Sequence, residues 1–222
     1  MSIPQDVQPV RIEPEGLDGF LGLAEQVRGV VIFAHGSGSG RFSPRNNFVA
    51  AALRSAGLGT FLLDLLSHTE ERDRRNVFNI GLLANRLALA RSWIKRHAEL
   101  AAQPIFYFGA STGAAAALAA AARDQTIAAV VSRGGRPDLA MDLLGDVRAP
   151  TLLIVGGWDH AVIDLNREAY ERLTCEKRLV IVPQASHLFE EPGKLDEVVK
   201  LATEWFQIHL NRPVSAGAAS GD

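Results

Sequence analysis

Short runs of apolar and β-branched residues alternate along the chain with longer segments in which apolar residues recur at helical spacing. Runs of this kind are typical of buried strands, and they predict six strands, at 30–36, 59–66, 104–110, 127–135, 150–157 and 177–183. The helical spacing predicts helices at about 44–56, 77–98, 112–123, 162–173 and 194–210. This alternation predicts an α/β fold, with a mostly parallel central sheet covered by helices on both faces.

The two ends of the chain depart from this pattern. Residues 10–16 and 19–25 are separated by a Gly/Asp turn, which predicts an antiparallel pair of strands leading into the parallel sheet. Residues 211–222 lack apolar periodicity and predict a flexible C-terminal tail. Because there is no internal repeat and no interdomain linker, we expect one domain over residues 1–210.

Composition narrows the classes of partner and the location. The net charge of -2 gives no basic field for a phosphate backbone, so we expect no nucleic-acid partner. Cys175 is the only cysteine, which excludes an internal disulfide and fits a reducing compartment. The first ten residues lack the basic and apolar regions of a secretory signal, and no stretch has the roughly 20 apolar residues of a membrane span. We therefore predict a cytoplasmic protein without a membrane partner.

The stretch FGASTGAA, residues 108–115, marks a sharp corner between a predicted strand and a predicted helix. In a GxSxG corner, Gly109 and Gly113 remove side chains that would collide with the neighbouring strand and helix, and Ser111 projects as a nucleophile. The amide of Thr112, at the positive end of the helix, would face a developing oxyanion. The alternative is that these glycines only cap a strand.

A serine nucleophile needs a histidine and an orienting carboxylate on later strand ends. Asp159 and His187 each follow a predicted strand by a few residues, and the order Ser, Asp, His is that of serine hydrolases on this fold. Asp138, after an earlier strand, is the main rival for the acid. His160 stays open as a rival base, although its place beside Asp159 favours a side chain that points away.

A second oxyanion donor is expected in the stretch AHGSGSGR, residues 34–41, where the glycines would let the amide of Ser37 face the same pocket. This run lacks both the GxGxxG spacing and the GK[ST] ending of nucleotide-binding loops. Residues 67–75 are charged but have no HxH or HExxH spacing, so we predict no metal site.

Three arginines lie close to these strand ends. Arg133 and Arg136 flank two glycines after a strand, and Arg45 begins the helix that follows the glycine-rich loop. Each could bind a substrate carboxylate or phosphate through its bidentate guanidinium, or could pair with a nearby acid to fix a loop. Arg133 is the best candidate for substrate binding.

With HGSGSG, GASTG, GGWD and ASH in this order, residues 28–210 resemble the α/β-hydrolase superfamily and, within it, the dienelactone hydrolase-like family. The resemblance implies Ser111 as nucleophile, His187 as general base, Asp159 as its orienting acid, and the amides of Ser37 and Thr112 as the oxyanion hole. True dienelactone hydrolases carry cysteine at the nucleophile position, so the serine puts dienelactone itself in doubt as the substrate. Residues 41–53, 62–71 and 130–140 are also similar to bacterial hydrolases that are sometimes fused to a phosphoribosyltransferase domain.

These observations predict a serine hydrolase that cleaves a small ester, lactone or thioester through an acyl-enzyme, without a metal or organic cofactor. Its partner would be a small-molecule substrate, and a monomer and a homodimer both stay open. The short connection between residues 135 and 150 excludes the large helical lid of many lipases. The alternative function is a non-catalytic member of the fold that binds a small molecule or a partner.

Overall fold

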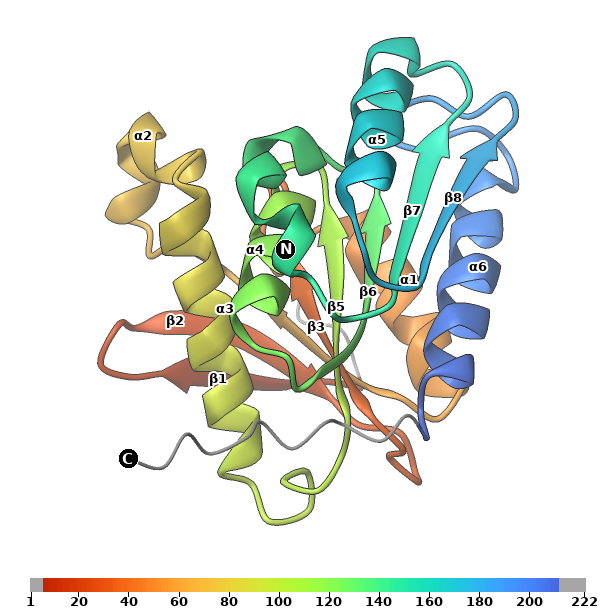
Figure 1. Cartoon of the computed structure of the whole chain (residues 1–222). Coiled ribbons are helices and arrows are strands. Elements are labelled where there is room, and N and C mark those ends of the chain that lie inside the picture. The colour runs from red at the N-terminus through yellow and green to blue at the C-terminus, as the bar shows by residue number, and fades with distance from the viewer. Residues whose placement is uncertain (1–5, 212–222) are drawn as a thin grey trace, which may run out of the picture.

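The computed structural model of the chain describes residues 6–211. One sheet runs through it, in the order β1-β2-β4-β3-β5-β6-β7-β8 (Figure 1). Its strands are β1 (Gln8–Ile12), β2 (Leu17–Gly22), β3 (Val30–Ala34), β4 (Gly59–Leu63), β5 (Ile105–Ala110), β6 (Ile127–Arg133), β7 (Thr151–Gly156) and β8 (Lys177–Val182). The six strands from β3 to β8 are parallel, and β1 and β2 add an antiparallel pair beside β4.

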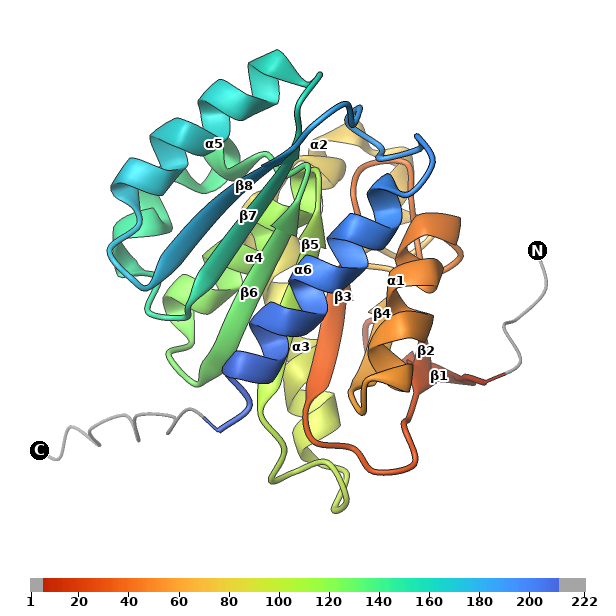
Figure 2. The same ribbon diagram turned by 90° about the vertical axis from the view of Figure 1, so that its right-hand side faces the viewer.

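Helices cover both faces of the sheet, as Figure 2 shows. The helical elements are α1 (Pro44–Ser55), η1 (Glu70–Arg72), α2 (Arg74–Val77), α3 (Ile80–Lys95), α4 (Thr112–Arg123), η2 (Pro137–Asp146), α5 (His160–Arg172) and α6 (Lys194–Ile208). Side chains of α1 and α6 form one apolar cluster with one face of the sheet, and those of α3, α4 and η2 form the larger cluster on the other face. The central strands are thus buried on both sides, which explains their continuous apolar runs.

The α/β prediction is confirmed, including an antiparallel pair of strands at the start. The turn between these two strands lies at 13–16, and not at Leu17 and Asp18, which belong to β2. The six predicted parallel strands and five predicted helices are present, and α4 has the predicted bounds of 112–123. The interval between β6 and β7 holds only η2, so there is no large lid at that place. The predicted tail over 211–222 lies outside the described residues except for residue 211.

The predicted helix at 77–98 is wrong at its start. The chain forms the single turn α2, breaks, and then begins α3 at Ile80. Asn79 causes this break, because its side chain accepts a hydrogen bond from the amide of Leu82 and caps α3 at 3.0 Å. The elements η1 and α2 were not predicted, since they are too short to show helical periodicity. The ten-residue η2 was not predicted either, because it is a 3₁₀ element with a kink at Ala140 and lacks the α-helical period.

The order of the strands locates a crevice for ligands. β3 and β5 are neighbours, but α1 follows β3 on one face while α4 follows β5 on the other. Loops that diverge in this way leave a crevice at the carboxyl ends of the two strands. The loop after β3 begins at His35 and Gly36, and the turn after β5 carries Ser111. Among residues 6–211, no helix is both long and apolar enough to cross a membrane.

Candidate active site

Ser111 occupies a strained corner between β5 and α4. Its φ of 52° and ψ of -123° lie in a region that few residues other than glycine adopt. Its amide donates to the carbonyl of Arg133 at 3.3 Å, and its carbonyl accepts from the amide of Arg136 at 3.0 Å. The hydroxyl does not cap α4. The loop after β6 therefore holds the backbone of Ser111 in place. The hydroxyl of Ser111 takes no part in these backbone contacts.

The two glycines of the GxSxG stretch occupy positions where there is no room for a side chain. A Cβ on Gly109 would lie 2.4 Å from Cα of Ala114, and one on Gly113 would lie 2.1 Å from the carbonyl oxygen of Ala34. Both contacts involve backbone, which cannot move aside without displacing the helix or the strand. This agrees with the predicted reason for the glycines, and it shows that α4 packs directly against the ends of β3 and β5.

His187 and Asp159 meet across two loops. The Nδ1 of His187 lies 2.6 Å from Oδ2 of Asp159, and the two side chains are 37% and 17% exposed. An ionised carboxylate can only accept, so Nδ1 carries the proton and Nε2 is left as the basic atom of the ring. This pair provides a base whose tautomer is fixed by an acid.

Backbone contacts hold these two loops together. The amide of Trp158 donates to the carbonyl of Ala185 at 3.0 Å, and that of Gly157 donates to the carbonyl of Val182 at 2.8 Å. A Cβ on Gly156 would approach the carbonyl oxygen of Ser186 to 2.4 Å, so the loops could not come this close with another residue there. The GGWD stretch thus acts as a spacer that brings Asp159 to His187.

The rivals for these two roles lie elsewhere. Asp138 makes a bidentate ion pair with Arg136, with nitrogen to oxygen distances of 2.7 and 2.8 Å. His160 begins α5 with an exposed side chain that makes no hydrogen bond within residues 6–211. Neither side chain makes a hydrogen bond or ion pair with His187.

Ser111 and His187 line one cavity of about 230 Å³. We call it the serine cavity, and its lining residues are Gly36, Ser37, Ser39, Ser43, Arg45, Asn46, Ala110, Ser111, Arg133, His187 and Leu188. Within residues 6–211, the hydroxyl of Ser111 makes no hydrogen bond, either to His187 or to another group. Such links are often long in free enzymes and shorten when substrate binds.

The two amides predicted to stabilise an oxyanion, those of Thr112 and Ser37, differ in their hydrogen bonds. The amide of Thr112 donates to no acceptor within residues 6–211. The amide of Ser37 was expected to be free, but it donates to the hydroxyl of Thr112 at 3.0 Å. Thr112 is the first residue of α4, and its side chain reaches the loop after β3. This contact joins two segments 75 positions apart and could not be seen in the sequence.

His35 fixes the start of the same loop. Its Nε2 accepts from the amide of Leu65 at 3.0 Å, and its Nδ1 lies 2.9 Å from the carbonyl oxygen of Gly36. The first contact leaves the proton on Nδ1, which donates to that carbonyl. A Cβ on Gly36 would lie 3.0 Å from Cβ of Ser111. His35 is thus a structural residue that holds the loop against Ser111.

Arg133 lies at the end of β6 with only 6% of its surface exposed. Its guanidinium has one contact with a side chain, to Oδ1 of Asn46 at 3.5 Å, and its Nε is buried without a partner. It pairs with no carboxylate among residues 6–211. Burial, and secondly the charge of Arg45, lowers the pKa of Arg133 to about 10, so the group is still cationic at neutral pH.

The two other arginines differ from Arg133. Arg45 lines the serine cavity, where its Nη1 pairs with Glu190 at 2.9 Å and its Nε is buried without a partner. Arg136 is committed to Asp138 and does not line the cavity. Asn46 and Glu190 had not been singled out from the sequence. Asn46 lies two positions into a predicted helix and Glu190 three positions after His187, but nothing in the sequence shows which arginine each one meets.

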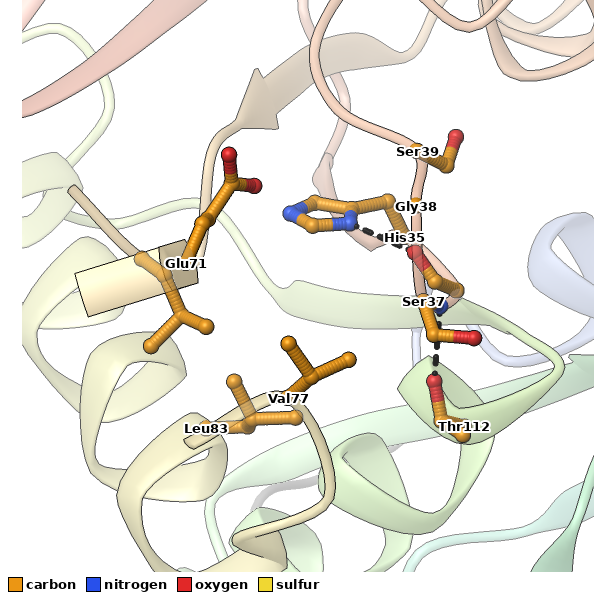
Figure 3. Close-up of a pocket in the computed structure, with 10 residues that line it drawn as sticks. His35, Ser37, Gly38, Ser39, Glu71, Val77, Leu83 and Thr112 are labelled. Atoms are coloured by element: carbon orange, nitrogen blue, oxygen red, sulfur yellow. Dashed lines mark hydrogen bonds between the residues drawn. The ribbon is translucent and has the colours of Figure 1, made fainter. Parts of the chain in front are cut away.

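A second cavity, of about 270 Å³, lies on the other side of the loop after β3 and is drawn in Figure 3. We call it the apolar cavity because Leu66, Val77 and Leu83 line it. In the figure, Val77 and Leu83 lie across from Ser37 and Thr112, with the side chain of Glu71 at one end. The two cavities share Gly36, Ser37 and Ser39, so they adjoin along this loop.

The sheet order, the strained serine corner and the crevice beside it define the chain as an α/β-hydrolase. Dienelactone hydrolase from Anabaena variabilis superposes with a TM-score of 0.87 and is 51% identical, over 92% of this chain and 99% of that one. The chain belongs to this dienelactone hydrolase-like family. The Xanthomonas campestris α/β serine hydrolase without lid shares the fold, with a TM-score of 0.75 at 21% identity over 95% of this chain and 98% of the other. No protein-family model matches the chain.

The chain is also similar to longer proteins. Two proteins from strains of Mycobacterium tuberculosis, both provisionally named phosphoribosyl transferases, are 54% identical over 205 residues. These residues are 92% of this chain but 46% of the relatives, so the chain spans about half the length of the curated relatives it matches. The relatives' name therefore does not by itself define the activity of the shared half.

Proposed function

We propose that this protein is a serine hydrolase that cleaves a small ester, lactone or thioester through an acyl-enzyme. The observation that carries the proposal is the 2.6 Å contact between His187 and Asp159, in a loop that lines the same cavity as Ser111. A nucleophile, a base with a free Nε2 and an acid that fixes the base are the three groups that acyl transfer requires. The 51% identity to a dienelactone hydrolase supports a hydrolase.

The proposed reaction has two balanced halves. His187 takes the proton of Ser111 as Oγ bonds to the carbonyl carbon, and then gives it to the leaving alcohol as the ester bond breaks. Water then attacks the acyl-enzyme while the same ring takes its proton, and the ring returns that proton to Oγ as the bond from Ser111 to the acyl carbon breaks, which releases the acid and the free serine. Asp159 keeps the ring oriented and stabilises its charged form.

The developing oxyanion would be stabilised by the amides of Thr112 and Ser37. The Thr112 amide is available as the structure has it. The Ser37 amide becomes available if the Thr112 hydroxyl rotates away from it. One such donor contributes about 3 kcal/mol to the stability of the transition state.

A non-catalytic binding protein is the second candidate. It is favoured by one observation, that the hydroxyl of Ser111 makes no hydrogen bond to His187 in this structure. The name of the mycobacterial relatives does not favour a transferase for this chain, because the shared half covers 46% of those proteins.

A fluorophosphonate probe separates the two candidates, because it reacts only with an activated serine. Labelling of the wild type that is lost in both Ser111→Ala and His187→Ala supports the hydrolase. Labelling that survives in Ser111→Ala, or no labelling of the folded wild type, overturns it. Circular dichroism of each variant shows that loss of labelling is not loss of folding.

A further inference from the structure

The cationic side of the serine cavity has no role in the proposed triad. Arg133 is a buried charge that pairs with no acid among residues 6–211, and burying an unpaired charge is costly in folding free energy. Arg136, three positions along, shows the usual solution, since Asp138 neutralises it. A charge kept unpaired in a cavity next to a nucleophile is an arrangement that a ligand's anion would complete.

We propose, resting on the proposed function, that Arg133 and Arg45 bind a phosphate group carried by the alcohol half of the ester substrate. Arg133 and Arg45 both line this cavity, and each has a buried Nε without a partner among residues 6–211; Ser39 and Ser43 line it as well. A phosphate monoester has three terminal oxygens and nearly two negative charges, so it can accept from both guanidinium groups at once. A carboxylate carries one charge and would balance Arg133 alone, with Arg45 left to Glu190, whereas a phosphate can engage both guanidinium groups.

Glu190 is the group that phosphate would replace. It pairs with Arg45 at 2.9 Å while 60% of its side chain is exposed. Exposed ion pairs of this kind contribute little, so a dianion bound beside Arg133 can displace it at small cost. The lining of the serine cavity includes no acidic residue that would repel the phosphate.

The position of His187 assigns the phosphate to the alcohol half. The histidine must give its proton to the leaving oxygen, so the alcohol lies on the side of the nucleophile where the ring lies. His187 and Arg133 line the same cavity, whereas the apolar cavity contains neither of them. The acyl half would then extend along the loop of Ser37 toward Leu66, Val77 and Leu83. Hydrolysis gives a carboxylic acid and a phosphorylated alcohol.

Three acetate esters with the same acyl group test this assignment, with acetate release as the measurement. They are 2-acetoxyethyl phosphate, acetoxyacetate and 2-methoxyethyl acetate, whose alcohol halves carry a phosphate, a carboxylate and a neutral ether. We expect kcat/KM for the phosphate ester to exceed that for the neutral ester by roughly 10- to 100-fold. Equal values for these two esters overturn the subsite. A carboxylate ester that matches or exceeds the phosphate ester overturns the choice of phosphate.

Variants assign the effect to the two arginines. Arg133→Met should abolish the preference for phosphate, Arg133→Lys should retain part of it, and Arg45→Gln should reduce it. Arg136→Gln is the matched control, because this arginine is ion-paired outside the cavity, and it should keep the full preference. A preference that persists in both Arg133→Met and Arg45→Gln overturns the proposal. Arg45 is one-third exposed, so its variant stays informative if Arg133→Met does not fold.

A binding measurement separates this inference from the proposed function. Calorimetry with Ser111→Ala and 2-hydroxyethyl phosphate reports on the subsite without any turnover. We expect Kd to rise at least about tenfold when Arg45→Gln is added. If no ester is hydrolysed but this binding depends on Arg45, the catalytic proposal fails and the phosphate subsite stands. If esters are hydrolysed but Ser111→Ala does not bind the phosphate, the subsite fails and the hydrolase stands.

Discussion

The serine cavity and the apolar cavity adjoin along one loop but are built from different parts of the chain. The serine cavity takes its arginines and histidine from the ends of β6 and β8 and from the start of α1. The apolar cavity takes Val77 and Leu83 from α2 and α3, which belong to the connection between β4 and β5. The comparison teaches that the charged and polar groups come from the ends of strands, while the connection between β4 and β5 supplies the apolar lining of the second cavity.

The largest effect should come from the nucleophile. Ser111→Ala should lower kcat for p-nitrophenyl acetate by a factor on the order of 10⁵ to 10⁶, because the remaining groups cannot form an acyl-enzyme. Steady-state kinetics measure this loss. The control is Ser55→Ala on the exposed end of α1, which should keep wild-type activity. Activity of more than a few per cent in Ser111→Ala would move the chemistry out of the serine cavity.

The second-largest effect should come from changing Asp159, the proposed acid of the triad. Asp159→Asn should lower kcat by about 10³- to 10⁴-fold, because an amide allows the wrong tautomer of His187 and does not stabilise the charged ring. Asp138→Asn is the matched control, and it should change kcat by less than about threefold since Asp138 contacts Arg136 instead. Equal losses in the two variants would show that the contact at 2.6 Å does not carry the catalytic role.

A smaller effect should come from filling the apolar cavity. Val77→Phe places a larger side chain in a space of about 270 Å³, so a longer acyl group loses room there. We expect the ratio of kcat/KM for p-nitrophenyl butyrate to that for the acetate to fall about tenfold. Turnover of the acetate in the same variant is the internal control. An unchanged ratio would mean that the acyl group does not enter this cavity.

The smallest effect should come from Thr112→Val, which removes the hydroxyl that accepts from the amide of Ser37. If the two backbone amides stabilise the oxyanion, kcat/KM should change by less than about threefold, because both amides are retained. Steady-state kinetics with p-nitrophenyl acetate check this. A loss beyond a hundredfold, in a variant with an unchanged melting temperature, would instead assign the hydroxyl itself to the oxyanion hole.

The sequence predicted the layers of the fold because burial on both sides leaves continuous apolar strands, and α4 shows its bounds through an alanine-rich stretch. The start of α3 was missed, although Asn79 carried a readable capping signal. The single turn η1 and the kinked 3₁₀ element η2 could not be predicted, because neither has the 3.6-residue period of an α-helix.

For the site, the order of Ser111, Asp159 and His187 was readable because strand ends gather at one edge of a parallel sheet. The sequence did not show how the surroundings of Arg133 and Arg136 differ, because two arginines beside the same glycines have the same chemistry. Only the fold shows that one lies against Asp138 and the other is enclosed without an acid. The contact of Ser37 with Thr112 likewise depends on how closely α4 approaches β3.

Helix α4 sets a limit on how this molecule can diversify. Its residues from Thr112 to Ala121 are all buried, and nearly all are alanine or glycine packed between the sheet, α3 and η2. Larger residues at the start of this helix would displace the corner that carries Ser111. Variation of the serine cavity must therefore arise from the surrounding loops and short turns, which can lengthen or repack while Ser111 stays where it is.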